Sequence, residues 1–213
     1  ISASQVKKLR ERTGAGMMRC KSALVESAGD LDKAIIVLRK RGLAASAKKA
    51  GRTTAEGIVA SYIHAGGKIG VMVEVNCETD FVAKTEAFQS LVRDVAMHIA
   101  AASPQVISRD QVDPDAVKAE SQIVREQALA SGKPEKVVER IVEGRMDRFF
   151  QDICLLEQSF VKDPDKNVQS LLHEAIGKLG ENICIRRFVR FGLGEPLAGE
   201  EDGHEPSSPP AAR

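Results

Sequence analysis

Two β-branched runs joined by a glycine-rich turn are the feature that most restricts what this chain can fold into. The runs are GIVASYIH at residues 57–64 and KIGVMVEVN at residues 68–76, and the connection between them reads AGG. Val, Ile and Tyr favour strands, and a short connection that contains glycine favours a tight turn. The pattern therefore predicts an antiparallel β-hairpin over residues 57–76.

A single hairpin cannot enclose a core, so the fold requires more strand and more helix. The best source of a third strand is NICIRRFVRF at residues 182–191, whose strand formers are Ile183, Ile185, Phe188 and Val189. Two amphipathic helices accompany the strands, one from about Thr85 to before Pro104 and one that ends at Gly180. Their apolar stripes are Phe88, Val92, Val95 and Ile99 in the first helix, and Val168, Leu171, Leu172, Ala175, Ile176 and Leu179 in the second. These elements predict an α/β core with a small antiparallel sheet of about three strands.

The N-terminal residues have a helical pattern of their own. Three short helices fit residues 4–42, and the third begins at an N-cap, Asp30, and ends at Gly42. The apolar positions are Val6 and Leu9, then Cys20, Ala23 and Leu24, then Leu31, Ala34, Ile35 and Leu38. A small three-helix bundle is therefore expected, followed by the basic linker AASAKKAGRTTAEG. Met17 and Met18 are adjacent and cannot share one helix face, so we expect one of them to pack inside.

The charge of the chain is unevenly distributed. Residues 1–52 carry 13 lysines and arginines against 4 acidic residues, whereas residues 195–213 carry 5 acidic residues and one arginine. A basic N-terminal module indicates an acidic partner, which is either nucleic acid or an acidic protein surface. The tail is also rich in Pro and Ser, and we expect residues 196–213 to be disordered.

Residues 105–159 differ from the segments on either side. Two charged helices meet at SGKP, where Gly132 ends one helix and Pro134 starts the next. Their apolar stripes are narrow and consist of Ile123, Leu129, Val138, Ile141, Val142 and Phe149. Narrow stripes favour a projecting helical hairpin over a core element. The predicted domains are thus residues 1–52, residues 53–104 together with 160–195, the inserted hairpin 105–159, and the tail 196–213.

Little in the sequence indicates enzymatic chemistry, a cofactor or a metal. A glycine-rich phosphate loop, a nucleophile elbow and a metal-ligand helix are all missing, and His98 falls in a predicted helix where we expect a structural role. Glu74, Glu78 and Asp80 could bind a divalent ion, but three carboxylates near a strand end are common, and we expect no metal site.

The scattered cysteines indicate neither a zinc site nor a disulfide framework. We expect reduced core residues at Cys20, Cys77, Cys154 and Cys184, with an intermolecular disulfide through Cys154 or Cys184 as the alternative. No apolar stretch approaches the roughly 18 residues that span a bilayer, and the first residues lack the apolar core of a secretory signal. Because the numbering opens on Ile, we expect an upstream residue or leader to be missing from it.

The stretch NCETDFVAKTE at residues 76–86 places a scarce aromatic ring in a polar turn. Phe81 follows Glu78, Thr79 and Asp80, in a chain with 7 phenylalanines, 1 tyrosine and no tryptophan. The ring is either the first core residue of the next helix or a contact for a partner.

Two longer stretches resemble the signature motifs of the bacterial elongation factor Ts family. They are VKKLRERTGAGMMRCKSAL at residues 6–24 and VEVNCETDFVAKTEAFQ at residues 73–89. Four more stretches agree: AMHIAA at 96–101, GKPEKVVERIVEGRM at 132–146, FVKDPDKNV at 160–168 and IGKLGENICIRRFVRF at 176–191. The resemblance extends to about Glu195. It implies a nucleotide exchange factor for the translational GTPase elongation factor Tu, which is a binding protein of the bacterial cytoplasm and not an enzyme, with no cofactor of its own.

The same resemblance implies an α+β fold. It consists of a three-helix bundle similar to a ubiquitin-associated domain, an α/β core with a small antiparallel sheet, and an inserted helical hairpin. The chain contains one VEVNCETDFVAK unit and so is similar to the short form of the family, in which two chains pair to rebuild a two-repeat core. A homodimer is therefore implied, through the edge strand near residues 183–191 and adjoining surfaces.

The resemblance also implies which residues contact the GTPase. Those implied to enter it near its nucleotide and magnesium are Asp80 and Phe81, with Thr79 and Val82 beside them. Those implied to contact its nucleotide domain are Arg10, Met17, Met18 and Lys21, and His64 with the turn at Gly66–Gly67 is implied to contact a different domain. One departure is Arg19, which stands where the family commonly has an acidic residue.

The alternative interpretation is a basic RNA- or ribosome-binding module. It would use the charges of residues 1–52, but the chain has neither aromatic residues placed to stack on bases nor a recognisable RNA-binding motif. The exchange-factor interpretation requires no direct contact with nucleic acid and no membrane.

Overall fold

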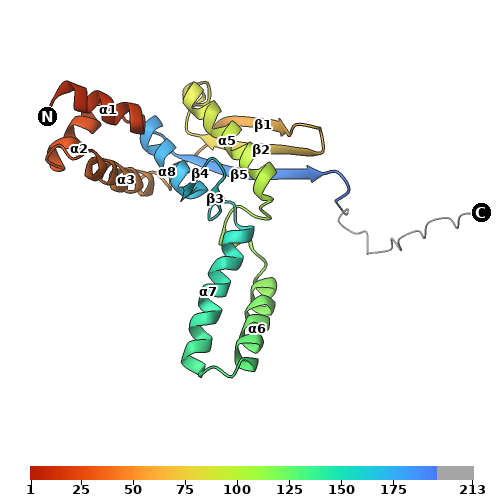
Figure 1. Ribbon diagram of the computed structural model, residues 1–213. Coiled ribbons are helices and arrows are strands. Elements are labelled where there is room, and N and C mark those ends of the chain that lie inside the picture. Colours follow the sequence, from red (N-terminus) through yellow and green to blue (C-terminus); the bar gives the residue numbers. More distant parts are fainter. Residues whose placement is uncertain (196–213) are drawn as a thin grey trace, which may run out of the picture.

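The computed structural model describes residues 1–195, which adopt an α+β fold (Figure 1). A helical bundle lies at one end, a small sheet with its helices lies beside it, and a long helical hairpin projects away from both. The predicted fold class is confirmed. The limits of the predicted domains stay a prediction, and the predicted disordered tail at 196–213 lies outside the described residues. None of the helices described is long and apolar enough to cross a membrane.

The N-terminal bundle is built from three capped helices. They are α1 (Ala3–Thr13), α2 (Met17–Glu26) and α3 (Leu31–Ala47). Ser2 forms a capping box with Gln5, and the predicted cap Asp30 accepts hydrogen bonds at 3.0 Å from the backbone N–H groups of Asp32 and Lys33. The buried core consists of Val6, Leu9, Cys20, Ala23, Leu24 and Ala34, with Leu31, Ile35 and Leu38 partly buried against it.

The third helix does not stop at Gly42, as the sequence had predicted, but continues to Ala47. Gly42 instead lies against α8 (Val168–Leu179), because a Cβ atom built on Gly177 of that helix would be 3.5 Å from the Gly42 Cα atom. The glycine therefore serves a close approach of two helices and does not terminate one.

The sheet contains the predicted hairpin and the predicted third strand. Its order is β1 (Glu56–Ile63), β2 (Ile69–Cys77), β5 (Ile183–Gly192), and both pairings are antiparallel. The turn after β1 contains Gly66 and Gly67 at φ of +92° and +69°, a backbone region that glycine adopts easily. In β5 a bulge at Arg186 leaves this residue without an opposing residue in the β2 register, and the alternation of side chains between the two sheet faces shifts by one residue there.

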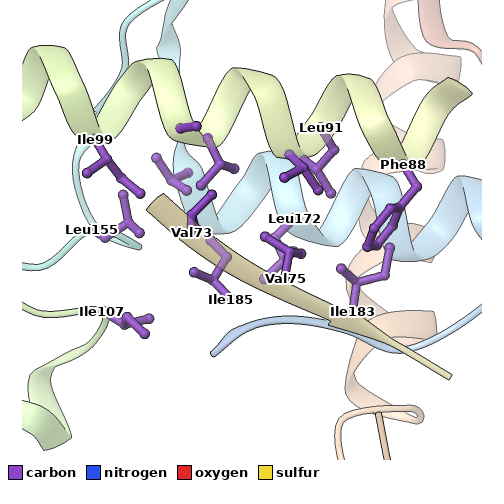
Figure 2. Packing of buried hydrophobic residues seen from close by; sticks show 14 of the residues in the cluster. Val73, Val75, Phe88, Leu91, Ile99, Ile107, Leu155, Leu172, Ile183 and Ile185 are labelled. Atoms are coloured by element: carbon purple, nitrogen blue, oxygen red, sulfur yellow. The ribbon is translucent and has the colours of Figure 1, made fainter. Parts of the chain in front are cut away.

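Two helices cover one face of this sheet. They are α5 (Glu86–Ala102) and α8, and Figure 2 shows their side chains meeting those of the strands. Val71, Val73 and Val75 of β2 are at most 2% exposed. The labelled residues around them are Phe88, Leu91 and Ile99 from α5, Leu172 from α8, and Ile183 and Ile185 from β5. The opposite face remains exposed, since Val59, Met72 and Val189 keep between 42% and 61% of their surface in solvent.

The predicted helical hairpin is formed by α6 (Pro114–Ala130) and α7 (Glu135–Ile153), after a short 3-10 turn, η1 (Arg109–Gln111). The buried contacts between the two helices are Val124, Ala128, Val138 and Val142. Ile123 and Leu129 were predicted in this stripe, which was wrong, since they are 49% and 51% exposed. Val124 and the small Ala128 occupy the contact instead, which lets the helices pack closely.

The sequence did not predict a second, two-stranded sheet where the hairpin returns to the core. It consists of β3 (Ser159–Phe160) and β4 (Asp163–Asn167). The segment DPDKN is charged and contains proline, so it lacks the alternating apolar pattern of a strand.

His98 is fully buried on α5 and holds this returning segment in place. The Gln158 amide nitrogen donates to the carbonyls of Asp152 at 2.8 Å and Ala102 at 3.3 Å, so its oxygen faces His98 Nε2 at 3.0 Å. Nε2 must therefore carry the hydrogen, and Nδ1 accepts from the backbone N–H of Val161 at 3.3 Å. The structural role predicted for His98 is confirmed, and the geometry selects the neutral imidazole.

We predict that protonation of His98 destabilises the fold. Burial lowers the pKa of His98 below 6.5, and the Gln158 hydrogen bond opposes that shift only in part. The unfolded chain then binds the proton more tightly, so this stability is complete above pH 6.5 and is lost as the pH falls toward the lowered pKa. One such group costs at most about 1.4 kcal/mol per pH unit. Burial also lowers the pKa of His173, which contributes with the same sign.

Urea unfolding of the wild type and of His98→Gln and His173→Gln at pH 7.5 and pH 5.5 separates the two contributions. The free energy of unfolding of wild type should fall at the lower pH, and the His98→Gln variant should fall less. An identical fall in wild type and His98→Gln would show that His98 does not carry the effect.

Candidate functional site

The segment after β2 forms one short helical turn that projects the Phe81 ring into solvent. This turn is α4 (Asp80–Ala83), and Thr79 is its N-cap, whose Oγ1 accepts from the backbone N–H of Val82 at 3.4 Å. Ala83 is buried and Val82 packs partly buried against the core. Phe81 points the other way and is 80% exposed. The core interpretation of Phe81 is therefore wrong, because one helical turn cannot direct adjacent residues to the same face.

Both ends of the turn are fixed by hydrogen bonds. Thr85 caps the start of α5 by accepting from the backbone N–H of Phe88 at 3.3 Å, and its hydroxyl donates to the Val82 carbonyl at 2.7 Å. At the other end, Thr79 donates from its backbone N–H and its hydroxyl to the carboxylate of Glu181. The side chains of Asp80, Phe81 and Lys84 extend from this frame toward solvent, and the Phe81 ring is the apolar one among them. We call residues 78–84 the Phe81 loop.

Asp80, which precedes the ring, is already paired with a cation. Lys84 Nζ lies 2.7 Å from its carboxylate, four residues along the chain. This hydrogen bond lowers the pKa of Asp80 and raises that of Lys84. The loop therefore presents an aromatic ring beside a neutralised ion pair.

The three carboxylates considered for a divalent ion do not converge. Glu74 binds Arg187 at 2.6 Å on the open face of the sheet, and Glu78 binds the backbone N–H of Asn182 at 2.6 Å. These contacts hold the pKa of each glutamate below its ordinary value. Within residues 1–195 no group of three potential ligands gathers that could hold a metal ion.

The predicted contact residues of the bundle form an exposed surface. Arg10, Met17, Met18 and Lys21 are all exposed, and Lys21 follows both methionines by three and four residues on α2. The prediction that one methionine packs inside was wrong, since Met17 and Met18 are 55% and 74% exposed. The buried face of α2 starts only at Cys20, so its first turn lies beyond the bundle core.

Arg19, the departure from the family pattern, connects the bundle to the core. Its guanidinium donates to the carbonyl of Gly177, and Lys49 Nζ reaches the carbonyl of Ile176 at 3.4 Å. Both carbonyls lie in the last turn of α8, where the helix dipole favours cations, and that of Ile176 also accepts from the backbone N–H of Gly180 at 3.0 Å. Burial and the neighbouring cations Arg52 and Arg19 lower the pKa of Lys49.

His64 lies apart from the other candidate residues. It is exposed in the β1–β2 turn, where its Nδ1 is 3.1 Å from the Tyr62 hydroxyl. The Phe81 loop follows the opposite end of the hairpin, since Glu56 at the start of β1 pairs with Cys77 at the end of β2. The candidate residues thus occupy three places: the α1–α2 surface, the Phe81 loop and the β1–β2 turn.

Sequence reasoning missed the residues that support the Phe81 loop from beneath. They are Glu181 and Asn182 in the turn between α8 and β5, and Arg52 in the linker. The sequence shows Glu181 and Asn182 only as an acidic and an amide residue after Gly180. Their role becomes visible only in the fold, where Glu181 binds Thr79.

Comparison with known proteins identifies the family. The profile of the family described as Elongation factor TS matches residues 45–195. The elongation factor Ts of Geotalea daltonii is 61% identical over 201 residues, which cover 94% of this chain and 93% of that protein. The protein of the same name from Acetivibrio thermocellus is 61% identical over 95% of this chain and 94% of its own length. That from Heliobacterium modesticaldum is 58% identical over the same shares. The chain therefore belongs to the elongation factor Ts family.

Proposed function

We propose that this chain accelerates GDP release from elongation factor Tu by inserting the Phe81 loop beside the bound nucleotide. Nucleotide exchange on elongation factor Tu is the activity of the elongation factor Ts family, to which the chain belongs. The observation that carries the proposal is the Phe81 ring, 80% exposed on a backbone that hydrogen bonds fix at both ends. The chain acts by binding and not by catalysing a covalent reaction, and its proposed location is the bacterial cytoplasm.

Exchange requires different affinities for two states of the GTPase. A factor that binds the nucleotide-free form more tightly weakens nucleotide binding by the same ratio. Burying one phenylalanine side chain is worth roughly 1.5–3 kcal/mol, and every 1.4 kcal/mol corresponds to about tenfold. The Phe81 ring can therefore weaken nucleotide binding by about 10- to 100-fold, so further contacts must contribute.

Asp80 acts on magnesium indirectly in this proposal. Its carboxylate is paired with Lys84, so direct binding of the ion would have to compete with that contact. Magnesium demands near-octahedral oxygen ligation and tolerates little distortion. Insertion of the ring, with Thr79 and Val82 holding its backbone, would shift the partner's groups around the ion and release ion and nucleotide together.

The bundle is the proposed anchor on the nucleotide domain of the GTPase. Met17 and Met18 offer exposed and adaptable apolar contacts, and Arg10 and Lys21 supply positive charge beside them. The β1–β2 turn with His64 is the proposed third contact, on another domain of the GTPase. In terms of the domains proposed from the sequence, the anchor lies in residues 1–52, and the β1–β2 turn lies in the α/β core.

A second copy of the chain is the proposed occupant of the open face of the sheet. The exposed apolar residues of this face are Val59, Ile63, Met72, Val189 and Phe191. The pairing of β2 with β5 supports one continuous surface. Met72 lies opposite Val189, and the next pair on the same face is Gly70 with Phe191. Strand β5 also forms an edge of the sheet, as the family resemblance requires for pairing. Cys154 is fully buried, which leaves Cys184 as the better placed thiol for a link between copies.

We predict that the chain releases a fluorescent GDP analogue from elongation factor Tu. With excess unlabelled GDP present, catalytic amounts should raise the release rate well above the intrinsic rate. An unchanged rate would contradict the proposed function, and salt-sensitive RNA binding by the same preparation would then favour the alternative.

We predict that Phe81→Ala lowers kcat/KM for exchange by about 10- to 100-fold, because it removes the apolar contact. Its free energy of unfolding should stay within about 0.5 kcal/mol of wild type, because the ring is exposed. Phe88→Ala is the matched control, since the Phe88 ring is fully buried. That variant should lose about 3–5 kcal/mol of stability. A Phe81→Ala variant that exchanges normally would contradict the role of the ring.

We predict that sedimentation under reducing conditions finds a dimer, and that Cys184→Ser retains it. Val189→Glu should dissociate the dimer because it buries a charge in the proposed interface. Val161→Glu is the matched control, since both valines are 42% exposed but Val161 lies away from the sheet face. A monomeric wild type, or equal effects of the two substitutions, would contradict the proposed interface.

A further inference from the structure

Two glutamates exchange hydrogen bonds between neighbouring loops beneath the Phe81 loop. Glu181, in the turn between α8 and β5, accepts from the backbone N–H of Thr79 at 3.0 Å and from its hydroxyl at 2.6 Å. Glu78, in the Phe81 loop, accepts from the backbone N–H of Asn182 at 2.6 Å. Each loop thus supplies a carboxylate to a backbone donor of the other. We call this arrangement the reciprocal clamp.

The clamp also holds the linker that follows the bundle. The Asn182 side-chain amide donates to the carbonyls of Arg52 at 3.0 Å and Ala50 at 3.5 Å. The Arg52 guanidinium in turn lies 3.4 Å from the Glu78 carboxylate. Three segments that are far apart in the sequence therefore meet at one half-buried joint, and the joint connects the bundle to the Phe81 loop.

Glu181 is the member of the clamp that acts directly on the conformation of the loop. Both of its oxygens are used on Thr79, which is two residues before Phe81. The Thr79 hydroxyl donates to Glu181 and accepts from Val82, so the carboxylate also orients the cap of α4. Hydrogen bonds to an ionised acceptor are about twice as strong as neutral ones. Without Glu181, the loop would keep its ring but lose the bonds that fix where the ring points.

We propose that Glu181 is a positioning residue for nucleotide exchange, which holds Thr79 so that α4 presents the Phe81 ring in its binding orientation. The inference rests on the proposed function of the Phe81 loop and assigns a residue outside that loop to it. A preordered loop loses less conformational freedom when it binds, so more of the energy of the ring contact appears as affinity for the nucleotide-free GTPase.

The substitution Glu181→Gln tests the clamp with a minimal change of shape. Glutamine has one acceptor oxygen and an NH₂ group, so it can satisfy only one of the two Thr79 donors and turns a donor toward the other. Hydrogen exchange of the peptide covering residues 78–84 should become about tenfold faster, because the loop loses the stabilisation of one charge-assisted hydrogen bond. The kcat/KM for GDP release should fall by about tenfold.

Glu157→Gln is the matched control. Glu157 is also a half-buried carboxylate that uses both oxygens, on Arg109 at the base of the helical hairpin. This control should leave exchange activity and the exchange of residues 78–84 unchanged. If Glu181→Gln proves too unstable, Thr79→Val removes the hydroxyl donor, and Thr79→Ser restores it.

A positioning role predicts that the double variant Glu181→Gln with Phe81→Ala is no slower than Phe81→Ala alone. Losses that multiply would show that Glu181 acts on something other than the ring. Normal activity in Glu181→Gln, or unaltered hydrogen exchange of the loop, would also overturn the inference. An inactive wild type would instead overturn the proposed function, so the two failures are distinguishable.

Discussion

Burial of a single sheet face determines how the rest of the molecule is arranged. The side chains of Val71, Val73 and Val75 in the central strand are shielded by α5 and α8, and each fully buried valine contributes on the order of 1.5–3 kcal/mol. Strand alternation then leaves the opposite face to solvent or to a second chain. In the sheet, Cys77 at the end of β2 pairs with Ile183 at the start of β5. This register makes the Phe81 loop, which follows β2, a neighbour of the Glu181 turn, which precedes β5.

The groups that hold the fold are separate from the exposed groups that we propose contact the GTPase. Arg19 and Lys49 cap the last turn of α8 and fix the bundle on the core, while the methionines of α2 stay exposed. Hydrogen bonds of carboxylates and threonines fix the backbone around Phe81. The exposed ring itself adds little to the stability of the folded chain. An exposed aromatic ring on an ordered backbone costs little conformational entropy when it binds, which suits a factor that must distinguish two states of one partner.

Local patterns predicted most of the fold. The strands, the amphipathic helices and the Asp30 cap follow from periodicity and capping preference, which act over a few residues. Errors arose where distant segments meet. Gly42 continues a helix because it faces Gly177, and β3 and β4 form although DPDKN has no strand pattern. For the site, the motif pointed to Phe81, but only the folded chain shows that Glu181 binds Thr79 beside it, although Thr79 and Glu181 are 102 residues apart in the sequence.

The most direct test of this account compares two affinities. Titration calorimetry should measure binding of the chain to elongation factor Tu with GDP bound and with the nucleotide removed, for wild type and for Phe81→Ala. The account predicts that wild type binds the nucleotide-free form far more tightly, and that loss of the ring lowers this ratio by about 10- to 100-fold. An equal loss of affinity for both forms would contradict it, because the ring would then support binding without driving exchange.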